Sequence, residues 1–527
     1  MPGEYIADEK TGDPPDDRGD NGEFDGTVVI LIGESSLAVA GPVRQHGESA
    51  DGTDDFELTA PSAGAKTKTN TKLAGGKVTL RANVFHAELW GNRDHKYAWL
   101  ENHSHATTPW TKLQPSVPLL LLVPRDDTGL TEYDKGWKVT DIFPTNTSGI
   151  VTARDGLVFD FDEKSLIQKI ERFVDPAKTD EEIRSTFFGG RKADKYPSGD
   201  TRGWKLPLAR NILQATEWKQ SILQCLYRPF DSRALLYTKG MIDWGRWNLM
   251  IALDGKFARD NLALVTSRMT KGEDFAHALL TDTPVEVICL SPKTSNNGFV
   301  FPLWVPDKDG ITRLLNIAPT FSAALAQALG RTTVRPYDLP DQTLAADILA
   351  YVYAVLHAPS FRRCYSEFLK SDFPRIPIAL HANATDDTTF ADVWSKLVPL
   401  GHELIDLHLL RKVPSALLAS FPVSGSLPVE KPRYELPNTP MNPGSSGRVY
   451  INMTQYFDDV EPETWAFTVG GYQVCEKRLK DRKGRTLSYD DTTHYSKIVA
   501  ALTRTRALMR EIDAVADGTL WASANCR

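Results

Sequence analysis

The stretch Gly470–Asp513 carries the strongest structural signal in the chain and reads GGYQVCEKRLKDRKGRTLSYDDTTHYSKIVAALTRTRALMREID. Within it, the nine consecutive residues 477–485 contain one acid, Asp481, and six cations: Lys477, Arg478, Lys480, Arg482, Lys483 and Arg485. Apolar residues at helical spacing then predict a helix over Thr492–Val515. Cations at this density need a polyanion or full solvation. A polyanion-binding segment and a solvated basic face are therefore the two alternatives.

Outside this segment the charge is balanced. The 527 residues carry a formal net charge of −7, and residues 1–26 account for all of it, with nine acids against Lys10 and Arg18. The other residues hold equal numbers of basic and acidic side chains. A neutral body with local basic clusters is compatible with nucleic-acid binding by a patch. Because residues 1–26 contain few apolar groups, we expect an acidic, disordered tail there.

Length and composition indicate a multidomain protein. A chain of 527 residues is too long for one core. Its 41% hydrophobic and 24% charged residues are ordinary for a globular protein. No apolar run reaches the roughly 18 residues of a transmembrane helix. The cysteines lack CxxC spacing, which predicts reduced thiols and a cytoplasmic protein; they are Cys225, Cys289, Cys364, Cys475 and Cys526.

The pattern along the chain mixes strands and helices and predicts a mixed α/β (α+β) fold. The segment LVFDFDEKSLIQKIERFV (157–174) predicts a strand and then a helix capped by Asp162. Helices are predicted over residues 341–372 and 391–411. Strands are expected at residues 27–33, 234–238, 262–266, 285–290 and 299–305.

Shifts in composition suggest five regions. They are the tail (1–26), an αβ region (27–330) that includes a loop at 47–76, a helical region (331–420), a Pro/Gly-rich connector (421–447) and a basic C-terminal strand-helix block (448–527).

Eight segments, in fixed order, are spread over most of the range from residue 85 to residue 515. They are WGNRDHKYAWL (Trp90–Leu100), TPWTKLQPSVP (Thr108–Pro118), DIFPTNTSGIVTARD (Asp141–Asp155), YRPFDSRALLYT (Tyr227–Thr238), NLALVTSR (Asn261–Arg268), SNNGFVFPLW (Ser295–Trp304), YDLPDQTLAADILAYVYAVLHAPSFRRCYSEFLKSDFPRIPI (Tyr337–Ile378) and GGYQVCEKRLKDRKGRTLS (Gly470–Ser488). Together they resemble the C-terminal specificity region of Type ISP restriction–modification enzymes, which are also similar to Type IIG enzymes. One departure is Arg478, where the family pattern has Trp, so a stacking role there is not expected.

The resemblance implies an αβ target-recognition body that binds double-stranded DNA sequence-specifically. Its role would be the specificity part of an adenine-N6 methyltransferase/endonuclease system in phage defence. Asp13-Pro14-Pro15-Asp16 lacks the aromatic ring that an amino-methyltransferase stacks on its target base, and no GxxxxGK[ST] loop is present. We therefore expect no catalytic residue, cofactor or metal in this chain. S-adenosylmethionine, ATP and magnesium are expected in a partner chain or a further domain.

Residues of the basic segment and of several polar loops are the DNA-binding candidates. Arg and Lys suit phosphates and guanine, and Asn suits adenine. Structural alternatives stand beside them: Arg228 or Arg233 pairs with Asp231, and Asn in a loop holds a turn. The candidates are Lys477, Arg478, Lys480, Arg482, Lys483, Arg485, Tyr472, Arg228, Arg233, Arg246, Arg268, Asn296 and Asn297.

Other motifs favour structure over chemistry. Trp244 and Trp247 in DWGRWN offer stacking, but their spacing is more typical of packing. Arg154 and Asp155 suggest an ion pair at a strand end. Two function hypotheses from other classes remain open: a divergent adenine methyltransferase that uses S-adenosylmethionine, and a fragment that serves only in assembly.

Overall fold

A computed structural model describes most of the chain. The described residues are 28–32, 39–42, 84–114, 122–189, 196–331 and 343–522, without 202, 256, 258, 259, 294, 295, 383, 386 and 437–445. The chain divides into two compact units, Met1–Asp126 and Asp127–Arg527. The predictions for residues 1–26 and 47–76 lie outside the described residues. The predicted bounds at residues 330, 420 and 447 stay predictions.

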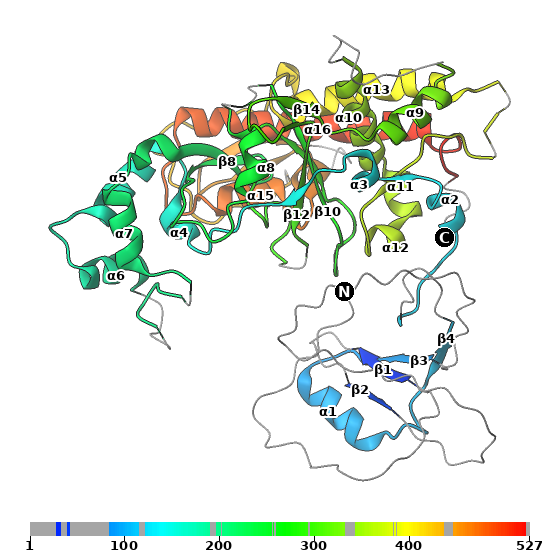
Figure 1. Ribbon diagram of the computed structural model, residues 1–527, viewed down its shortest axis with the longest axis horizontal. Helices are drawn as coiled ribbons and strands as arrows, with labels where there is room; N and C mark the ends of the chain where they lie inside the picture. The colour runs from blue at the N-terminus through cyan, green and yellow to red at the C-terminus, as the bar shows by residue number, and fades with distance from the viewer. Residues whose placement is uncertain are drawn as a thin grey trace. The chain divides into compact units, whose positions relative to one another are not determined.

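The first unit contains one mixed sheet with the strand order β2-β1-β3-β4 (Figure 1). The strand predicted from TVVILIG is confirmed as β1 (Val28–Ile32), which pairs antiparallel with β2 (Val39–Pro42) and parallel with β3 (Val84–Glu88). Helix α1 (Arg93–Asn102) joins β3 to β4 (Thr111–Leu113).

Two antiparallel sheets organise the first half of the second unit. One has the order β11-β10-β12-β6, and its strand β10 is buried along its whole length. The other has the order β7-β9-β8. Their strands are β6 (Thr147–Ser148), β10 (Ala263–Ser267), β11 (Ala278–Thr281), β12 (Gly298–Pro302), β7 (Phe159–Asp160), β8 (Ile222–Arg228) and β9 (Asp231–Leu236). The strands predicted at 234–238, 262–266 and 299–305 are found as β9, β10 and β12, the last continued by β13 (Trp304–Pro306).

The strand predicted at residues 285–290 is wrong. Only Val285 and Glu286 pair, as isolated bridges to Leu226 and Ile150. The chain then turns, because Ile288 N donates to the Glu286 carboxylate at 3.0 Å and Cys289 N donates to Glu286 O at 3.1 Å. A side chain that binds its own backbone competes with a sheet ladder.

Helices α5 (Glu163–Val174), α6 (Asp180–Phe188) and α7 (Leu206–Gln214) group at one end of this unit (Figure 1). The predicted cap is confirmed: the Asp162 side chain accepts from Ser165 N at 2.7 Å and begins α5. One face of α5 is buried through Leu166, Ile170 and Phe173.

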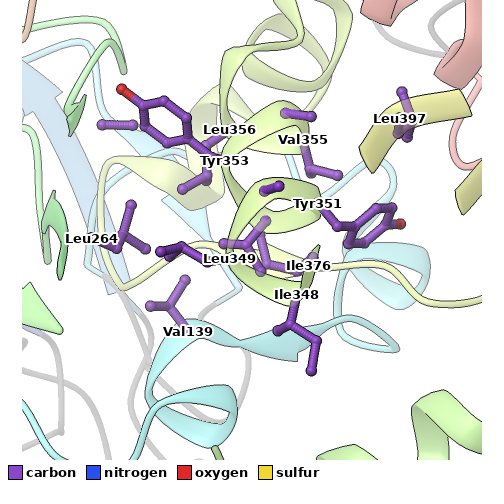
Figure 2. Packing of buried hydrophobic residues seen from close by; sticks show 14 of the residues in the cluster. Val139, Leu264, Ile348, Leu349, Tyr351, Tyr353, Val355, Leu356, Ile376 and Leu397 are labelled. Atoms are coloured by element: carbon purple, nitrogen blue, oxygen red, sulfur yellow. The ribbon is translucent and has the colours of Figure 1, made fainter. Parts of the chain in front are cut away.

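Three long helices form the main core of the second unit: α10 (Thr343–His357), α13 (Phe390–His408) and α16 (Tyr489–Ala516). Helix α10 is buried all round between residues 348 and 356, as its continuous apolar sequence requires. Figure 2 shows its side chains directed to opposite sides, with Val139, Leu264, Ile376 and Leu397 around them. The helices predicted over 341–372 and 391–411 are confirmed, apart from residues 341 and 342, which lie outside the described part.

The C-terminal block folds back onto this core. The predicted connector carries β16, and β17 begins at its last residue, Gly447, so the connector contributes to a small sheet with the order β16-β17-β18. The elements of the connector and of the block before α16 are β16 (Arg433–Glu435), β17 (Gly447–Tyr450), β18 (Tyr456–Val460), α14 (Pro462–Trp465), β19 (Thr468–Val469), β20 (Tyr472–Gln473) and α15 (Val474–Lys480).

Short elements complete the second unit. They are α2 (Leu130–Tyr133), β5 (Trp137–Lys138), α3 (Val139–Ile142), α4 (Asp155–Val158), α8 (Trp247–Met250), β14 (Arg313–Leu315), α9 (Pro319–Ala328), α11 (Pro359–Cys364), α12 (Ser366–Leu369), β15 (Arg375–Ile376) and 3-10 turns at Trp218–Ser221, Ile251–Leu253 and Ser415–Leu417. This mixture confirms the predicted α+β class.

The cysteines depart from the sequence-based prediction at one position. Cys225, Cys289 and Cys475 are buried free thiols, whereas Cys364 is disulfide-bonded. Cysteine spacing carries no information on which thiols the fold brings together.

No helix among the described residues is both long and apolar enough to span a membrane.

A buried carboxylate ties the C-terminal block to the β8–β9 hairpin. Asp231, at the start of β9, accepts hydrogen bonds from three arginines: Arg233 at 2.7 and 3.0 Å, Arg482 at 3.0 Å, and Arg478. Arg233 also donates to Asp481 at 2.8 Å. We call Asp231, Arg233, Arg478 and Arg482 the charge hub.

Burial and charge oppose each other in the charge hub. Burial by itself would raise the pKa of Asp231, but Arg478, Arg482 and Arg233 together hold it well below its usual range. Burial also lowers the pKa of Arg478 to about 10, against the attraction of Asp231. The cluster thus persists because every buried charge faces an opposite one.

Replacement of Asp231 by asparagine should destabilise the protein by about 3–5 kcal/mol, because it leaves buried arginine charge uncompensated. Arg233 and Arg482 retain Asp481 and Asp491, but Asp231 is the only side-chain acceptor of Arg478 among the described residues. Urea unfolding followed by circular dichroism measures the loss.

The same measurement at several pH values adds a second criterion. Because folding depresses the pKa of Asp231, its stabilisation is complete above its unfolded-state pKa near about 4 and declines below that pH. The gap between wild type and Asp231→Asn should therefore narrow below about pH 4. As a control, Glu476→Gln removes the exposed ion pair with Lys480 and should cost less than about 1 kcal/mol. Equal losses in the two variants would contradict the role of the hub.

Gly401→Ala should destabilise the protein by about 3 kcal/mol, because helices α10 and α13 touch at this residue. A Cβ at Gly401 would lie 2.0 Å from Ala350 O, which is backbone and cannot move aside. The matched control is Gly156→Ala in α4, where a Cβ meets nothing within 4 Å and the better helix propensity of alanine should preserve or raise stability. Opposite signs of the change in unfolding free energy are expected, and a loss of equal size in both would refute the close contact.

Candidate nucleic-acid interface

The basic segment begins at a glycine pair that is docked against the αβ body. Gly470 N donates to Ala276 O at 2.7 Å and Gly471 N donates to Leu290 O at 2.9 Å. Gly470 has a φ of +56°, and a Cβ there would lie 1.9 Å from Leu290 O. Only glycine meets both conditions. The direction of the following β20 and α15 is thereby fixed.

The six cations of the segment divide into three pairs: two are buried, two are paired with nearby acids, and two are exposed without an ion pair to any described residue. Arg478 and Arg482 are buried in the charge hub. Lys477 is paired with Asp481, and Lys480 Nζ lies 2.9 Å from a Glu476 carboxylate oxygen.

Lys483 and Arg485 follow in the turn before α16, and both are exposed. Neither forms an ion pair with any described residue. Their positive charge is therefore available to an external anion.

The Phe161 ring contacts Arg485, one of the two exposed cations. The guanidinium of Arg485 stands 4.3 Å from the centre of the Phe161 ring, and those of Arg233 and Arg482 stand 4.4 and 4.7 Å from it. Attraction between a cation and a ring face restrains the position of Arg485 without neutralising it. Arg485 is thus both charged and held in place.

Arg228 and Tyr472 lie inside the protein. Of the two predicted partners of Asp231, Arg233 forms the pair and Arg228 does not. Arg228 Nη1 donates to Glu286 at 2.7 Å, and its guanidinium lies 3.9 Å from the Tyr227 ring centre. The Tyr472 hydroxyl donates to Ile288 O at 3.0 Å, and burial raises its pKa. These contacts are structural.

Asn296 is also fully buried. Its Oδ1 accepts from Lys271 N and its Nδ2 donates to Glu273, each at 2.8 Å. Glu273 in turn accepts from Ser291. The amide therefore holds a turn, as the structural alternative predicts, while the neighbouring Asn297 is only half-buried.

Of the remaining candidates, Arg268 is exposed and Arg246 is half-buried. The Arg268 side chain is 51% exposed, with Nε 3.9 Å from an Asp372 carboxylate oxygen. Arg246 lies 5.0 Å from the centre of the Trp244 ring, and Trp244 is itself strongly exposed. The packing prediction therefore fits Trp247, which contacts Tyr237, but is wrong for Trp244. DNA binding by the candidate residues stays a prediction.

The ion pair predicted between Arg154 and Asp155 is wrong. Arg154 is buried and pairs with Asp243, 89 residues away. Asp155 instead accepts from Thr152 and from the Tyr227 hydroxyl, the latter at 3.0 Å. The two neighbours have different partners because Arg154 is the residue that precedes α4, with extended φ, and Asp155 is the first residue of that helix.

Sequence reasoning missed the long-range part of the charge hub. It named Arg228 or Arg233 as the partner of Asp231 but did not indicate that Arg478 and Arg482 reach the same carboxylate. The one available signal was Arg478 itself, a charge where the family pattern has an apolar ring.

No group of three or more His, Cys, Asp or Glu in the described part of the chain is arranged to hold a metal ion.

Three solved structures, each a complex with DNA or a DNA substrate mimic, are similar in fold. The DrdV–DNA complex matches with a TM-score of 0.58 and 18% identity over 82% of this chain and 43% of that one. A nuclease-deletion mutant of the Type ISP restriction–modification enzyme LlaGI, in complex with a DNA substrate mimic, matches with 0.54 and 17% over 83% and 33%. The ATP-dependent Type ISP restriction–modification enzyme LlaBIII bound to DNA matches with 0.57 and 16% over 82% and 28%.

This chain thus spans less than half the length of these structures. No curated protein matches it. A family model, described as the Type ISP C-terminal specificity domain, matches residues 141–511, well over half of the chain. The chain therefore belongs to the family of Type ISP C-terminal specificity domains.

Proposed function

We propose that this chain recognises a double-stranded DNA sequence as the specificity part of a restriction–modification enzyme. The family match over residues 141–511 carries the proposal. The solved structures of similar fold support it, because each is a complex with DNA or a DNA mimic. A divergent methyltransferase gains no support, since the matching family describes a specificity domain.

The buried cations and the exposed cations have different roles in this proposal. Arg478, Arg482 and Arg228 hold the scaffold together and have no free surface for DNA. Lys483 and Arg485 stand outside the charge hub and suit phosphate oxygens, which fix the register of a protein on its duplex. Base reading falls to polar side chains that remain accessible, such as Arg246, Arg268 and Asn297.

Chemistry on the DNA would come from a partner chain or a further domain. S-adenosylmethionine would bind there, together with ATP and magnesium if that part also translocates or cuts. The cytoplasm, where the DNA to be read lies, is the compartment that we propose. Recognition and catalysis would then be separable, with this chain selecting the site.

Selection from a random duplex pool tests the proposal directly. The purified chain is incubated with the pool at moderate salt, and the bound fraction is sequenced. An enriched motif is the expected result. Stable, folded protein that binds no duplex even at low salt would refute the proposal and favour a role in assembly alone.

The double variant Lys483→Ala/Arg485→Ala should weaken DNA binding and flatten its salt dependence. If each cation neutralises one phosphate, the slope of log K against log salt concentration should fall by about 2. Fluorescence anisotropy with a labelled duplex over a range of salt concentrations measures this slope.

As a control, Lys308→Ala removes an exposed cation from the turn between β13 and β14 and should leave the slope unchanged. Unfolding free energy should be unaffected in Lys308→Ala and should fall by no more than about 1 kcal/mol in the double variant, which removes no ion pair of the described structure but loses the contact of Arg485 with the Phe161 ring. An unchanged slope in the double variant would place the phosphate contacts elsewhere.

A further inference from the structure

Trp244 is the more exposed of the two strongly exposed tryptophans in the described structure. It lies in the loop between β9 and α8, and 61% of it is accessible to solvent. A tryptophan offers a large apolar face, and leaving that face in water is unfavourable. Its position therefore calls for an explanation that the fold alone does not provide.

The loop presents Trp244 rigidly. Asp243 accepts a hydrogen bond from the buried Arg154. Trp244 N donates to Val151 O and Val151 N donates to Trp244 O, both at 3.0 Å. The next carbonyl, that of Gly245, accepts from the Tyr237 hydroxyl at 2.7 Å. Three consecutive residues are thus anchored, while the Trp244 side chain stays exposed to solvent.

The backbone around Trp244 is strained. Arg246 has a φ of +56°, in the left-handed region that residues with a side chain rarely adopt. A Cβ at Gly245 would lie 2.3 Å from the Trp247 indole, so only glycine fits there. Conformations of this kind persist where surrounding contacts impose them, and they cluster at binding sites. Here they place the Arg246 guanidinium 5.0 Å from the centre of the exposed Trp244 ring.

Apart from Trp244, the exposed side chains of this loop and of the start of α8 are polar. They are Lys239, Asp243 and Asn248. Protein contacts that depend on tryptophan usually surround it with further apolar groups. A lone aromatic face next to a guanidinium instead combines the two groups that nucleic acids require: a surface for a base and a charge for a phosphate.

We propose that Trp244 is a stacking platform for a DNA base that leaves the helical stack, with Arg246 on the adjoining phosphate. The inference rests on the proposed function, because it presupposes that the chain binds DNA. It goes further in naming the residue and the mode of contact. Because stacking uses a ring face common to all bases, this contact adds affinity for an opened step and not sequence preference.

The probe is a pair of duplexes of equal sequence, one fully paired and one with a single extrahelical 2-aminopurine. The wild-type chain should prefer the bulged duplex and quench the fluorescence of its 2-aminopurine. Trp244→Ala should lose the quenching and bind the bulged duplex about tenfold more weakly. Trp244→Phe should keep much of the preference, since it retains an aromatic face.

The control is Trp90→Ala, which removes an exposed tryptophan whose indole N–H is bound to Glu88 at 3.0 Å. It should behave as wild type. Thermal unfolding of all variants should be unchanged, because the replaced rings are exposed.

The outcomes separate the two ideas. Salt-sensitive binding of both duplexes by Trp244→Ala, with wild-type preference and quenching, would overturn the stacking role and leave the proposed function intact. Absence of DNA binding by the wild-type chain would overturn the proposed function itself. Leu208 and Ile212 of α7 are also exposed, so a protein contact is the competing role. Self-association that Trp244→Ala abolishes, with DNA binding unchanged, would overturn the proposal in favour of that contact.

Discussion

The sharing of one buried carboxylate by three arginines is the constraint on which the C-terminal half of this structure depends. Asp231 begins a strand, whereas Arg478 and Arg482 lie on and just after helix α15, almost 250 residues later. An isolated charge in this position would be strongly unfavourable. The hairpin and the helix must therefore come together for either to be buried. Their relative position follows from charge compensation as much as from apolar packing.

Apolar packing reinforces this arrangement from the other side. Helix α16 begins after the basic segment and runs against α10 and α13, which pack so closely at Gly401 that a Cβ there would clash with Ala350. Polar contacts also link these helices and their neighbours. Arg504 of α16 donates to Glu403 of α13 at 2.6 Å, and Trp521 Nε1 donates to Ser360 at 2.7 Å. The basic block is consequently part of the second unit's core and not a separate appendage.

This architecture changes the meaning of a dense run of cations. A sequence with six positive charges in nine residues looks like a single patch, but the fold buries two of them and pairs two more with nearby acids. The charge left for an external anion is small and is held in place by the Phe161 ring and the turn after α15. A neutral body with a few fixed cations favours register and orientation on DNA over nonspecific attraction. Trp244 follows the same arrangement: buried groups such as Arg154 hold its loop, and only a few side chains remain exposed for contact with DNA.

The sequence by itself determined the elements whose signals are local. Apolar periodicity and capping residues predicted α5, α10, α13 and α16, β-branched runs predicted β1 and β10, and the ordered segments indicated the family. Local patterns also told which residue types could bind DNA. They failed at residues 285–290, where the Glu286 side chain binds the backbone and ends the pairing.

Only the tertiary structure decided which cations face inward, that Arg154 pairs with Asp243, and that Trp244 stays in solvent while Trp247 is packed. Each of these depends on partners that are distant along the chain, and the residues next to a side chain in sequence do not indicate which distant residues it will contact.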